Sequence, residues 1–345
     1  MIATVLKEYG FESDACMVQS FGSGLINSTW KIINGDKAYI LQRINHKIFK
    51  QPEHIAENIS MVAEFLQQYY PDYLFVAPLK TVTAQETLFC FDDDYFRMFP
   101  FVQQSHTIDV VTKPGQAYEA AVQFGAFTKK LAGFNAANLK ITLPDFHNLT
   151  LRYRQFENVL VNGNAQRIKD AAGAIATIKS YKTIVDDFEK IKLDNDFKIR
   201  ATHHDTKISN VLFDEQDKGL CVIDLDTIMP GYFISDVGDM LRTYLSPANE
   251  EEKDFSKIDI RDDYFTAVKK GYLLEMNDEL TAKEKQSFVY AGKFMIYMQA
   301  LRFLTDYFND DAYYGEKYAG HNLIRAKNQL VLLEKLSAKE RSGNI

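Results

Sequence analysis

The side chains best suited to chemistry lie between residues 202 and 226. Asp205 is followed five positions later by Asn210, and Asp224 comes at the end of the next apolar run. One carboxylate can orient an attacking hydroxyl and accept its proton, while an amide oxygen and a second carboxylate hold Mg²⁺ against phosphates. Lys207 adds a cation for the transferred phosphoryl group. The spacing predicts phosphoryl transfer, with Asp205 and Lys207 catalytic and with Asn210 and Asp224 binding Mg²⁺.

Other interpretations of these residues are weaker. A lone aspartate between strands most often caps a turn, and only the combined spacing of the set favours catalysis. His203 and His204 lie beside Asp205, but no third histidine or cysteine is near enough in the sequence to suggest a zinc site. We therefore expect structural roles for both histidines, with His203 shaping the loop.

Short strands must bring the catalytic set together. Residues 198–202, 211–213 and 221–224 favour strands, and a hairpin of the last two would place Asn210 beside Asp224. Helical periodicity dominates elsewhere in the second half of the chain, at residues 116–134, 165–191, 262–274, 281–307 and 322–336.

The first hundred residues are rich in strands. A predicted helix, which begins at Pro52 and ends at Tyr69, interrupts predicted strands at 17–22, 29–33, 38–43, 87–91 and 95–101. Polar residues follow the last strand. These patterns predict an α+β fold of two lobes, a small antiparallel sheet lobe at 1–103 that binds nucleotide and a larger helical lobe at 104–345 that holds the catalytic and substrate sites, with ligands between them.

The sheet lobe carries candidates for nucleotide binding. Small residues between the first two strands let backbone N–H groups approach phosphates. The third strand has no lysine at the position where kinases hold the α- and β-phosphates, so Arg43 is the candidate cation, with Glu57 as its leading partner and Glu53, one helical turn earlier, as the second choice. The last strand would end in a hinge that contacts adenine. The predicted nucleotide-binding residues are Gly22, Ser23, Gly24, Asn27, Arg43, Glu57, Phe99 and Phe101.

Composition narrows the class of protein. The 345 residues are 46% hydrophobic and 25% charged, which excludes a disordered chain and a small disulfide-stabilised protein. The net charge of −7 gives no overall field that would attract nucleic acid or anionic membranes. The chain has three widely spaced cysteines, no secretion signal and no uninterrupted apolar span. We expect a cytoplasmic protein without nucleic-acid or membrane partners; no feature of the sequence indicates its oligomeric state.

These motifs resemble the aminoglycoside phosphotransferase-like family of small-molecule kinases, and within it a subgroup of N-acetylhexosamine 1-kinases. The resemblance implies a protein-kinase-like fold. It also implies ATP- and Mg²⁺-dependent phosphorylation of the anomeric hydroxyl of N-acetylglucosamine or N-acetylgalactosamine. The matching segments are residues 22–27, 39–45, 48–50, 57–59, 202–213, 223–231 with Asp236 and Asp239, and 302–307.

The resemblance also assigns individual roles. Asp205 would be the base, and Arg302 would contact the sugar. Asp226 would be either a second Mg²⁺ contact or a brace for its loop. The polar and aromatic residues that follow Arg302 suit a sugar, which presents hydroxyl groups at its rim and C–H faces. The predicted acceptor-site residues are Asp205, Arg302, Asp306, Tyr313 and Tyr314.

Two alternatives stay open at this point. A kinase of the same fold could phosphorylate another small hydroxyl compound, such as choline, homoserine, methylthioribose or an aminoglycoside. A nucleotide-binding pseudokinase is the non-enzymatic alternative, but such proteins usually lack the base or a metal ligand, and both are present here.

Overall fold

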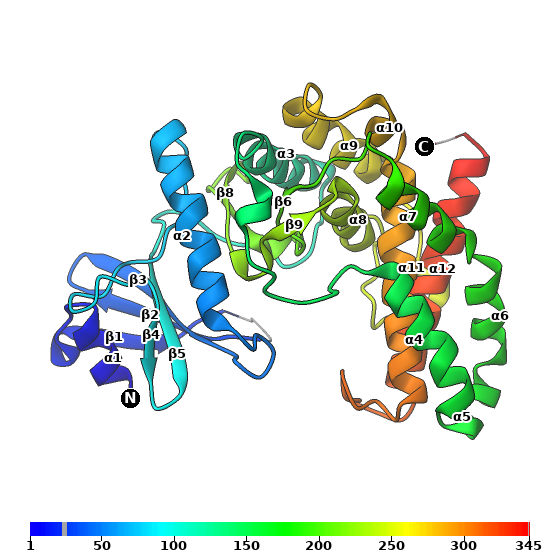
Figure 1. Ribbon diagram of the computed structural model, residues 1–345, viewed down its shortest axis with the longest axis horizontal. Helices are drawn as coiled ribbons and strands as arrows, with labels where there is room; N and C mark the ends of the chain where they lie inside the picture. Colours follow the sequence, from blue (N-terminus) through cyan, green and yellow to red (C-terminus); the bar gives the residue numbers. More distant parts are fainter. Residues whose placement is uncertain (23–25, 344) are drawn as a thin grey trace.

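The computed structural model describes residues 1–22, 26–343 and 345. A five-stranded sheet with two helices forms one lobe, and helices with two short strand pairs form the other (Figure 1). The last strand of the sheet ends at Pro100, and the first helix of the second lobe begins at Pro114. A boundary at residue 103 stays a prediction.

The sheet is antiparallel, with the strand order β1-β2-β3-β5-β4. Leu41 of β3 is directly opposite Met98 of β5, so both side chains lie on the same face of the sheet. This face packs against α1, where the two residues form a small core with Val5 and Leu6. Because successive side chains of a strand alternate, Gln42 lies on the opposite face. The elements of this lobe are α1 (Ile2–Glu8), β1 (Cys16–Ser20), β2 (Ser28–Asn34), β3 (Lys37–Ile44), α2 (Pro52–Tyr69), β4 (Phe89–Phe91) and β5 (Asp94–Pro100).

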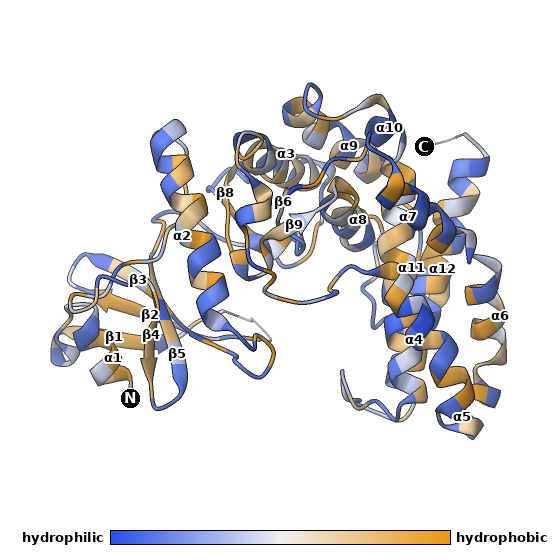
Figure 2. Cartoon of the chain, viewed as in Figure 1, coloured by the Kyte–Doolittle hydropathy of each residue, from blue (hydrophilic) through white to orange (hydrophobic). Residues whose placement is uncertain are grey.

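Helix α2 forms where the sequence predicts it and joins the lobes. Its buried residues recur at helical spacing, so apolar and hydrophilic residues occupy different sides of the helix (Figure 2). Asn58 is fully buried in α2, where its Nδ2 donates to the carbonyl oxygens of Lys140 and Ile228, each at 2.9 Å. Asn58 Oδ1 accepts from the backbone N–H of Lys140. This buried amide therefore ties the first lobe to two segments of the second.

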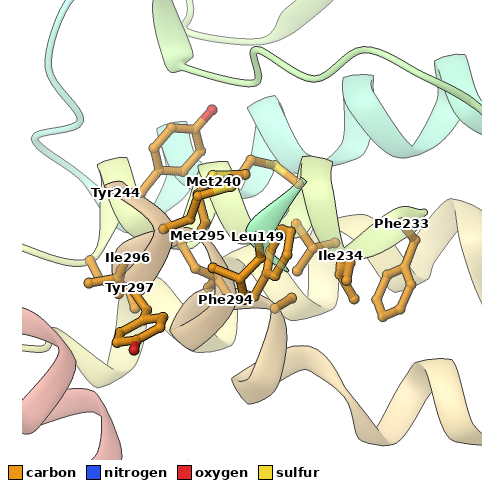
Figure 3. Close-up of a cluster of buried hydrophobic side chains, with 14 of the residues drawn as sticks. Leu149, Phe233, Ile234, Met240, Tyr244, Phe294, Met295, Ile296 and Tyr297 are labelled. Atoms are coloured by element: carbon orange, nitrogen blue, oxygen red, sulfur yellow. The ribbon is translucent and has the colours of Figure 1, made fainter. Parts of the chain in front are cut away.

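The second lobe is built around two packed groups of helices. Helix α3 packs along α9, and α11 packs between α8, α12 and α4. Side chains from α8 and α11, together with Leu149 of α4, form the core drawn in Figure 3. The elements are α3 (Pro114–Lys130), α4 (Leu149–Asn162), α5 (Ala165–Asp170), α6 (Ala172–Ser180), α7 (Thr183–Leu193), β6 (Arg200–Thr202), β7 (Val211–Phe213), β8 (Gly219–Val222), β9 (Met229–Gly231), α8 (Phe233–Tyr244), α9 (Asp262–Met276), α10 (Ala282–Gln286), α11 (Phe288–Phe308) and α12 (His321–Arg341).

The structure differs from the sequence-based prediction in several helical regions, since α1 was not predicted and the helix predicted at 281–307 is divided into α10 and α11. Residues 165–191 form parts of three helices instead of one. Helices α4 and α8 were not predicted, although Asn148 caps α4 by accepting from the backbone N–H of Leu151. Helix α8 contains buried Asp236, Gly238 and Asp239, which resemble loop residues in the sequence. In the structure a Cβ on Gly238 would lie 2.4 Å from the carbonyl oxygen of Ala291, so glycine permits the close contact with α11.

In the described part of the chain, no helix combines the length and the apolar character that a bilayer crossing requires.

Candidate active site

Two short strand pairs hold the loop that contains the catalytic set. Strand β6 pairs with β9, and β7 pairs with β8, so the chain between β6 and β7 is fixed at both ends. The backbone N–H of Ile223 donates to the carbonyl oxygen of Asn210 at 2.9 Å, and the ring of His203 contacts the carbonyl oxygen of Ile223 at 2.9 Å. These contacts bring Asn210 next to the segment that contains Asp224, as the sequence predicts.

Two buried aspartates of helix α8 hold the same loop in place. The carboxylate of Asp236 accepts the backbone N–H groups of His203 at 3.1 Å and His204 at 2.7 Å. One turn later, Asp239 accepts the backbone N–H of Thr206 at 2.9 Å. Burial raises the pKa of Asp236 to about 7, although both backbone N–H groups favour its ionised form. The sequence analysis assigned no role to Asp236 and Asp239. Their spacing of three residues, which places both side chains on one face of a helix, is the feature of the sequence that could have indicated a shared role.

Asp205, Lys207 and Asn210 form one hydrogen-bonded group. Lys207 Nζ donates to Asp205 Oδ2 at 2.9 Å, and Asn210 Nδ2 donates to the same oxygen at 3.0 Å. Burial opposes ionisation of Asp205, but Lys207 outweighs burial and lowers the carboxyl pKa. Burial likewise opposes the charge on Lys207, but Asp205 and Asp224 outweigh it and raise the ammonium pKa. An ionised carboxylate and a charged lysine therefore lie side by side.

Asn210 and Asp224 have the donor atoms that Mg²⁺ prefers. The amide nitrogen of Asn210 is directed to Asp205, which leaves Oδ1 without a hydrogen-bond donor among the described residues. No described residue donates to the carboxylate of Asp224 either, and burial, followed by the charge of Asp226, raises the pKa of Asp224 to about 7. A carboxylate in this environment is stabilised by a cation. The pair therefore fits Mg²⁺, which binds few protein oxygens and completes its shell with water and phosphate.

Asp226 links the two lobes. Its side chain is 4% exposed, and Arg97 Nη2 of β5 lies 2.5 Å from its Oδ1. Asn27 Nδ2 donates to its Oδ2 at 2.8 Å, while Asn27 Oδ1 accepts the backbone N–H of Asn45. Both carboxylate oxygens thus contact the sheet lobe. These contacts are those expected of a brace, which is one of the two roles that the sequence left open for Asp226.

The predicted pair of Arg43 and Glu57 does not form. Arg43 faces the same side of the sheet as Leu41, where its Nη1 contacts Asp94 at 3.1 Å and its Nη2 donates to Ser28. Glu57 instead lies 3.8 Å from Lys140, with both side chains half exposed. Strand alternation explains why Arg43 does not face the second lobe, because successive side chains of β3 point to opposite faces of the sheet. Arg97, which is paired with Gln42, lies on the other face and reaches the second lobe. Arg97 is a site residue that the sequence analysis missed.

The remaining predicted nucleotide residues lie in the turn after β1 and at the end of β5. Gly22 has φ of 80°, a conformation that favours glycine, while Ser23 and Gly24 lie outside the described residues. Phe99 lies 5.1 Å from the Arg97 guanidinium. Lys31 Nζ lies over the ring of Phe101, 3.8 Å from the ring centre. Nucleotide contacts by these residues stay a prediction.

Arg302 lies among aromatic rings at the predicted acceptor site. Its guanidinium is 5.5 Å from the ring centre of Tyr314, 5.7 Å from Phe146 and 6.0 Å from Tyr313. Its described hydrogen bond is to Gln299 Oε1 at 3.3 Å. Tyr313 is 73% exposed, so this ring is free to contact a ligand.

Asp306 has an internal role instead of the predicted contact with the acceptor. Its carboxylate accepts the backbone N–H groups of Tyr313 at 2.8 Å and Tyr314 at 2.9 Å, and it also accepts from Asn322 Nδ2. Asp306 is 5% exposed. It therefore holds the segment between α11 and α12 in place, and that segment carries both tyrosines.

A second arginine and a histidine accompany Arg302. Arg152 lies at the start of α4, and burial, followed by the charge of Arg302, lowers its pKa. His147 stacks on Phe146 with ring centres 4.4 Å apart and lies 5.2 Å from the ring of His204, next to Asp205. Burial, followed by the nearby His204 ring and arginine charges, lowers the pKa of His147 well below its usual range. Among described residues, neither arginine pairs with a carboxylate side chain.

Comparisons with known proteins agree with this arrangement. A model of the phosphotransferase enzyme family matches residues 18–258, which is more than half of the chain. A microcompartment-associated aminopropanol kinase is 15% identical, with a TM-score of 0.69 over 99% of this chain and 97% of that chain. A spectinomycin phosphotransferase in complex with ADP and spectinomycin is 14% identical, with a TM-score of 0.56 over 99% and 98%.

A choline kinase from Cryptosporidium parvum Iowa II is 11% identical, with a TM-score of 0.59 over 100% of this chain and 97% of that chain. These likenesses confirm the predicted α+β fold, with a five-stranded antiparallel sheet in one lobe and helices dominating the other. On the strength of the family match and the assembled catalytic loop, the chain belongs to the phosphotransferase enzyme family.

Proposed function

We propose that this protein transfers the terminal phosphoryl group of ATP, with Mg²⁺, to the anomeric hydroxyl of an N-acetylhexosamine. One observation carries the kinase part of the proposal. Asp205 is hydrogen-bonded to Lys207 and Asn210, while Asp224, close enough to raise the pKa of Lys207, has no hydrogen-bond donor among the described residues. This arrangement provides a base, a cation and two oxygen ligands in one place.

The chain's residues would divide the reaction as follows. Asp205 orients the acceptor hydroxyl and accepts its proton as the new O–P bond forms and the bond between the γ-phosphorus and the bridging oxygen breaks, which releases ADP. Mg²⁺, held by Asn210 and Asp224, would neutralise charge on the phosphates. Lys207 moves from Asp205 to the transferred phosphoryl oxygens. Because Lys207 lowers the pKa of Asp205 in the absence of substrates, its departure makes Asp205 a stronger base when both substrates are present.

The charge at the acceptor site favours a sugar over a cationic substrate. Arg302 and Arg152 have no carboxylate partner among the described residues, and Asp306 is occupied by backbone N–H groups. A cationic acceptor such as choline would be repelled by both arginines. The carbonyl and hydroxyl oxygens of an acetamido sugar can instead accept from Arg302, while Tyr313 can cover the C–H face of the ring.

A substrate panel tests the proposal. The protein is incubated with ATP, Mg²⁺ and one acceptor at a time, and products are detected by phosphorus NMR. We expect an anomeric phosphate from N-acetylglucosamine or N-acetylgalactosamine and no product from choline. Phosphorylation of another hydroxyl compound alone would contradict the acceptor assignment, while an absence of ATP turnover with every acceptor would favour the pseudokinase alternative.

A further inference from the structure

We propose that Arg97 is a positioning residue for the Mg²⁺ ligand Asp224 and that it acts through Asp226. The proposal rests on the nucleotide- and metal-binding part of the proposed function and is independent of the acceptor. In kinases a lysine of the third strand pairs with a glutamate of the following helix and so connects the sheet to the site. Here Arg97 would make the equivalent connection, from β5 directly to the metal-binding segment.

The sheet holds Arg97 in a defined orientation. Arg97 is 3% exposed, and its Nε and Nη2 both donate to Gln42 Oε1, at 3.0 and 2.9 Å. Gln42 and Arg97 are directly opposed in the ladder of β3 and β5, so the amide and the guanidinium lie on the face toward the second lobe. Gln42 is next to Arg43 but points to the other face. A glutamine on β3 thus orients an arginine on β5.

Arg97 contacts the second lobe at a short distance from the metal ligand. Its Nη2 lies 2.5 Å from Asp226 Oδ1, and Asp226 is two residues after Asp224. Asp224 has φ of 64° and ψ of 59°, a left-handed conformation that aspartate adopts more readily than most residues with a side chain. The Arg97–Asp226 ion pair joins β5 to the backbone two residues after Asp224, so it can hold this segment in position.

Charge gives a second reason for this role. Asp226 is 4% exposed and follows Asp224 by two residues, so its negative charge is buried close to the metal ligand. Without Arg97, the described residues would leave Asp226 as a buried carboxylate with the Asn27 amide as its partner, and its repulsion of Asp224 would increase. Arg97 therefore favours the orientation of Asp224 that binds a cation.

The test compares metal binding by Arg97→Met, Arg97→Lys and Asp226→Asn. Mn²⁺ replaces Mg²⁺ as a probe, and its binding to the complex with ADP is measured by electron paramagnetic resonance. Removal of partners that orient metal ligands typically weakens metal affinity about 10- to 100-fold, which we expect for Arg97→Met and, to a smaller extent, for Asp226→Asn. Arg97→Lys should retain part of the affinity. The double variant should bind Mn²⁺ no more weakly than Arg97→Met alone, because both changes remove one interaction.

Controls separate this role from general stability and from the proposed function. Arg167→Met also removes an arginine that pairs with a buried carboxylate, Asp311, but this pair lies in the second lobe outside the proposed metal site, so Mn²⁺ affinity should stay unchanged. Adenosine binding, which needs no metal, should persist in every variant. If Arg97→Met lowers the melting temperature but binds Mn²⁺ like the unaltered protein, or if Arg167→Met weakens Mn²⁺ binding as much as Arg97→Met does, the inference is overturned. If the unaltered protein binds neither ADP nor Mn²⁺, the proposed function is overturned as well.

Discussion

Replacement of Asp236 by alanine should destabilise the protein and disable the catalytic loop together. The carboxylate accepts two backbone N–H groups, those of His203 and His204, and both residues are buried. Asp236→Ala leaves both donors unpaired, and each buried unpaired N–H costs about 1–3 kcal/mol. We therefore expect the free energy of unfolding to fall by about 2–6 kcal/mol, a large part of the roughly 5–15 kcal/mol typical of folded proteins.

Urea denaturation followed by circular dichroism measures this loss. Asp236→Asn keeps one acceptor oxygen and should lie between alanine and the unaltered protein. Asp187→Ala is the matched control, because Asp187 is a helical aspartate whose described partner is exposed Lys190, and its removal should change the free energy by less than about 0.5 kcal/mol. A loss below about 1 kcal/mol for Asp236→Ala would refute the role assigned to these two hydrogen bonds.

Four further outcomes are expected. Asp205→Asn should lower turnover by about 10²–10⁴-fold while ATP affinity stays within a few-fold, as measured by steady-state kinetics and calorimetry. Arg302→Met should lower kcat/KM for the acceptor by about 10- to 100-fold without changing the KM for ATP, and equal effects on both substrates would contradict acceptor binding. Gly231→Ala should cost about 1–3 kcal/mol in urea denaturation, because its Cβ would lie 2.5 Å from Nε2 of His204. Burial raises the pKa of Asp236 to about 7 in the folded protein, so the stabilisation that comes from protonation of this carboxyl, apart from its two hydrogen bonds, is fully present below about pH 4 and is lost as the pH rises to 7, with a slope of at most about 1.4 kcal/mol per pH unit. The stability of Asp236→Asn should therefore vary less with pH over that range, and an unchanged pH profile would argue against this titration.

The catalytic set could be predicted because its geometry is local. Asp205, Asn210 and Asp224 lie within one loop and one hairpin, so sequence spacing alone determines that they meet. The same holds for α2, whose apolar period and initial proline mark both its face and its start.

The missed residues depend on contacts between distant elements. The order Leu41, Gln42, Arg43 shows that Gln42 and Arg43 point to opposite faces, but only the packing of α1 determines which face is covered. Arg97 then reaches Asp226 through a register of β3 and β5 that no local pattern specifies. Likewise, Asp306 was assigned to the acceptor because the sequence does not show that backbone N–H groups fill its oxygens.

The hydrogen bonds by which Asp306 holds residues 309–320 in place determine which substitutions this segment can tolerate. The carboxylate of Asp306 accepts from the backbone N–H groups of residues 313 and 314 and from the amide of Asn322 at the start of α12. These hydrogen bonds therefore do not depend on the side chains at positions 313 and 314. At the lower end of α11 in Figure 1, the segment can therefore exchange its aromatic rings while both flanking helices stay where they are. If these two positions contact the acceptor as we propose, substitutions there would change the acceptor preference while the catalytic loop keeps its geometry.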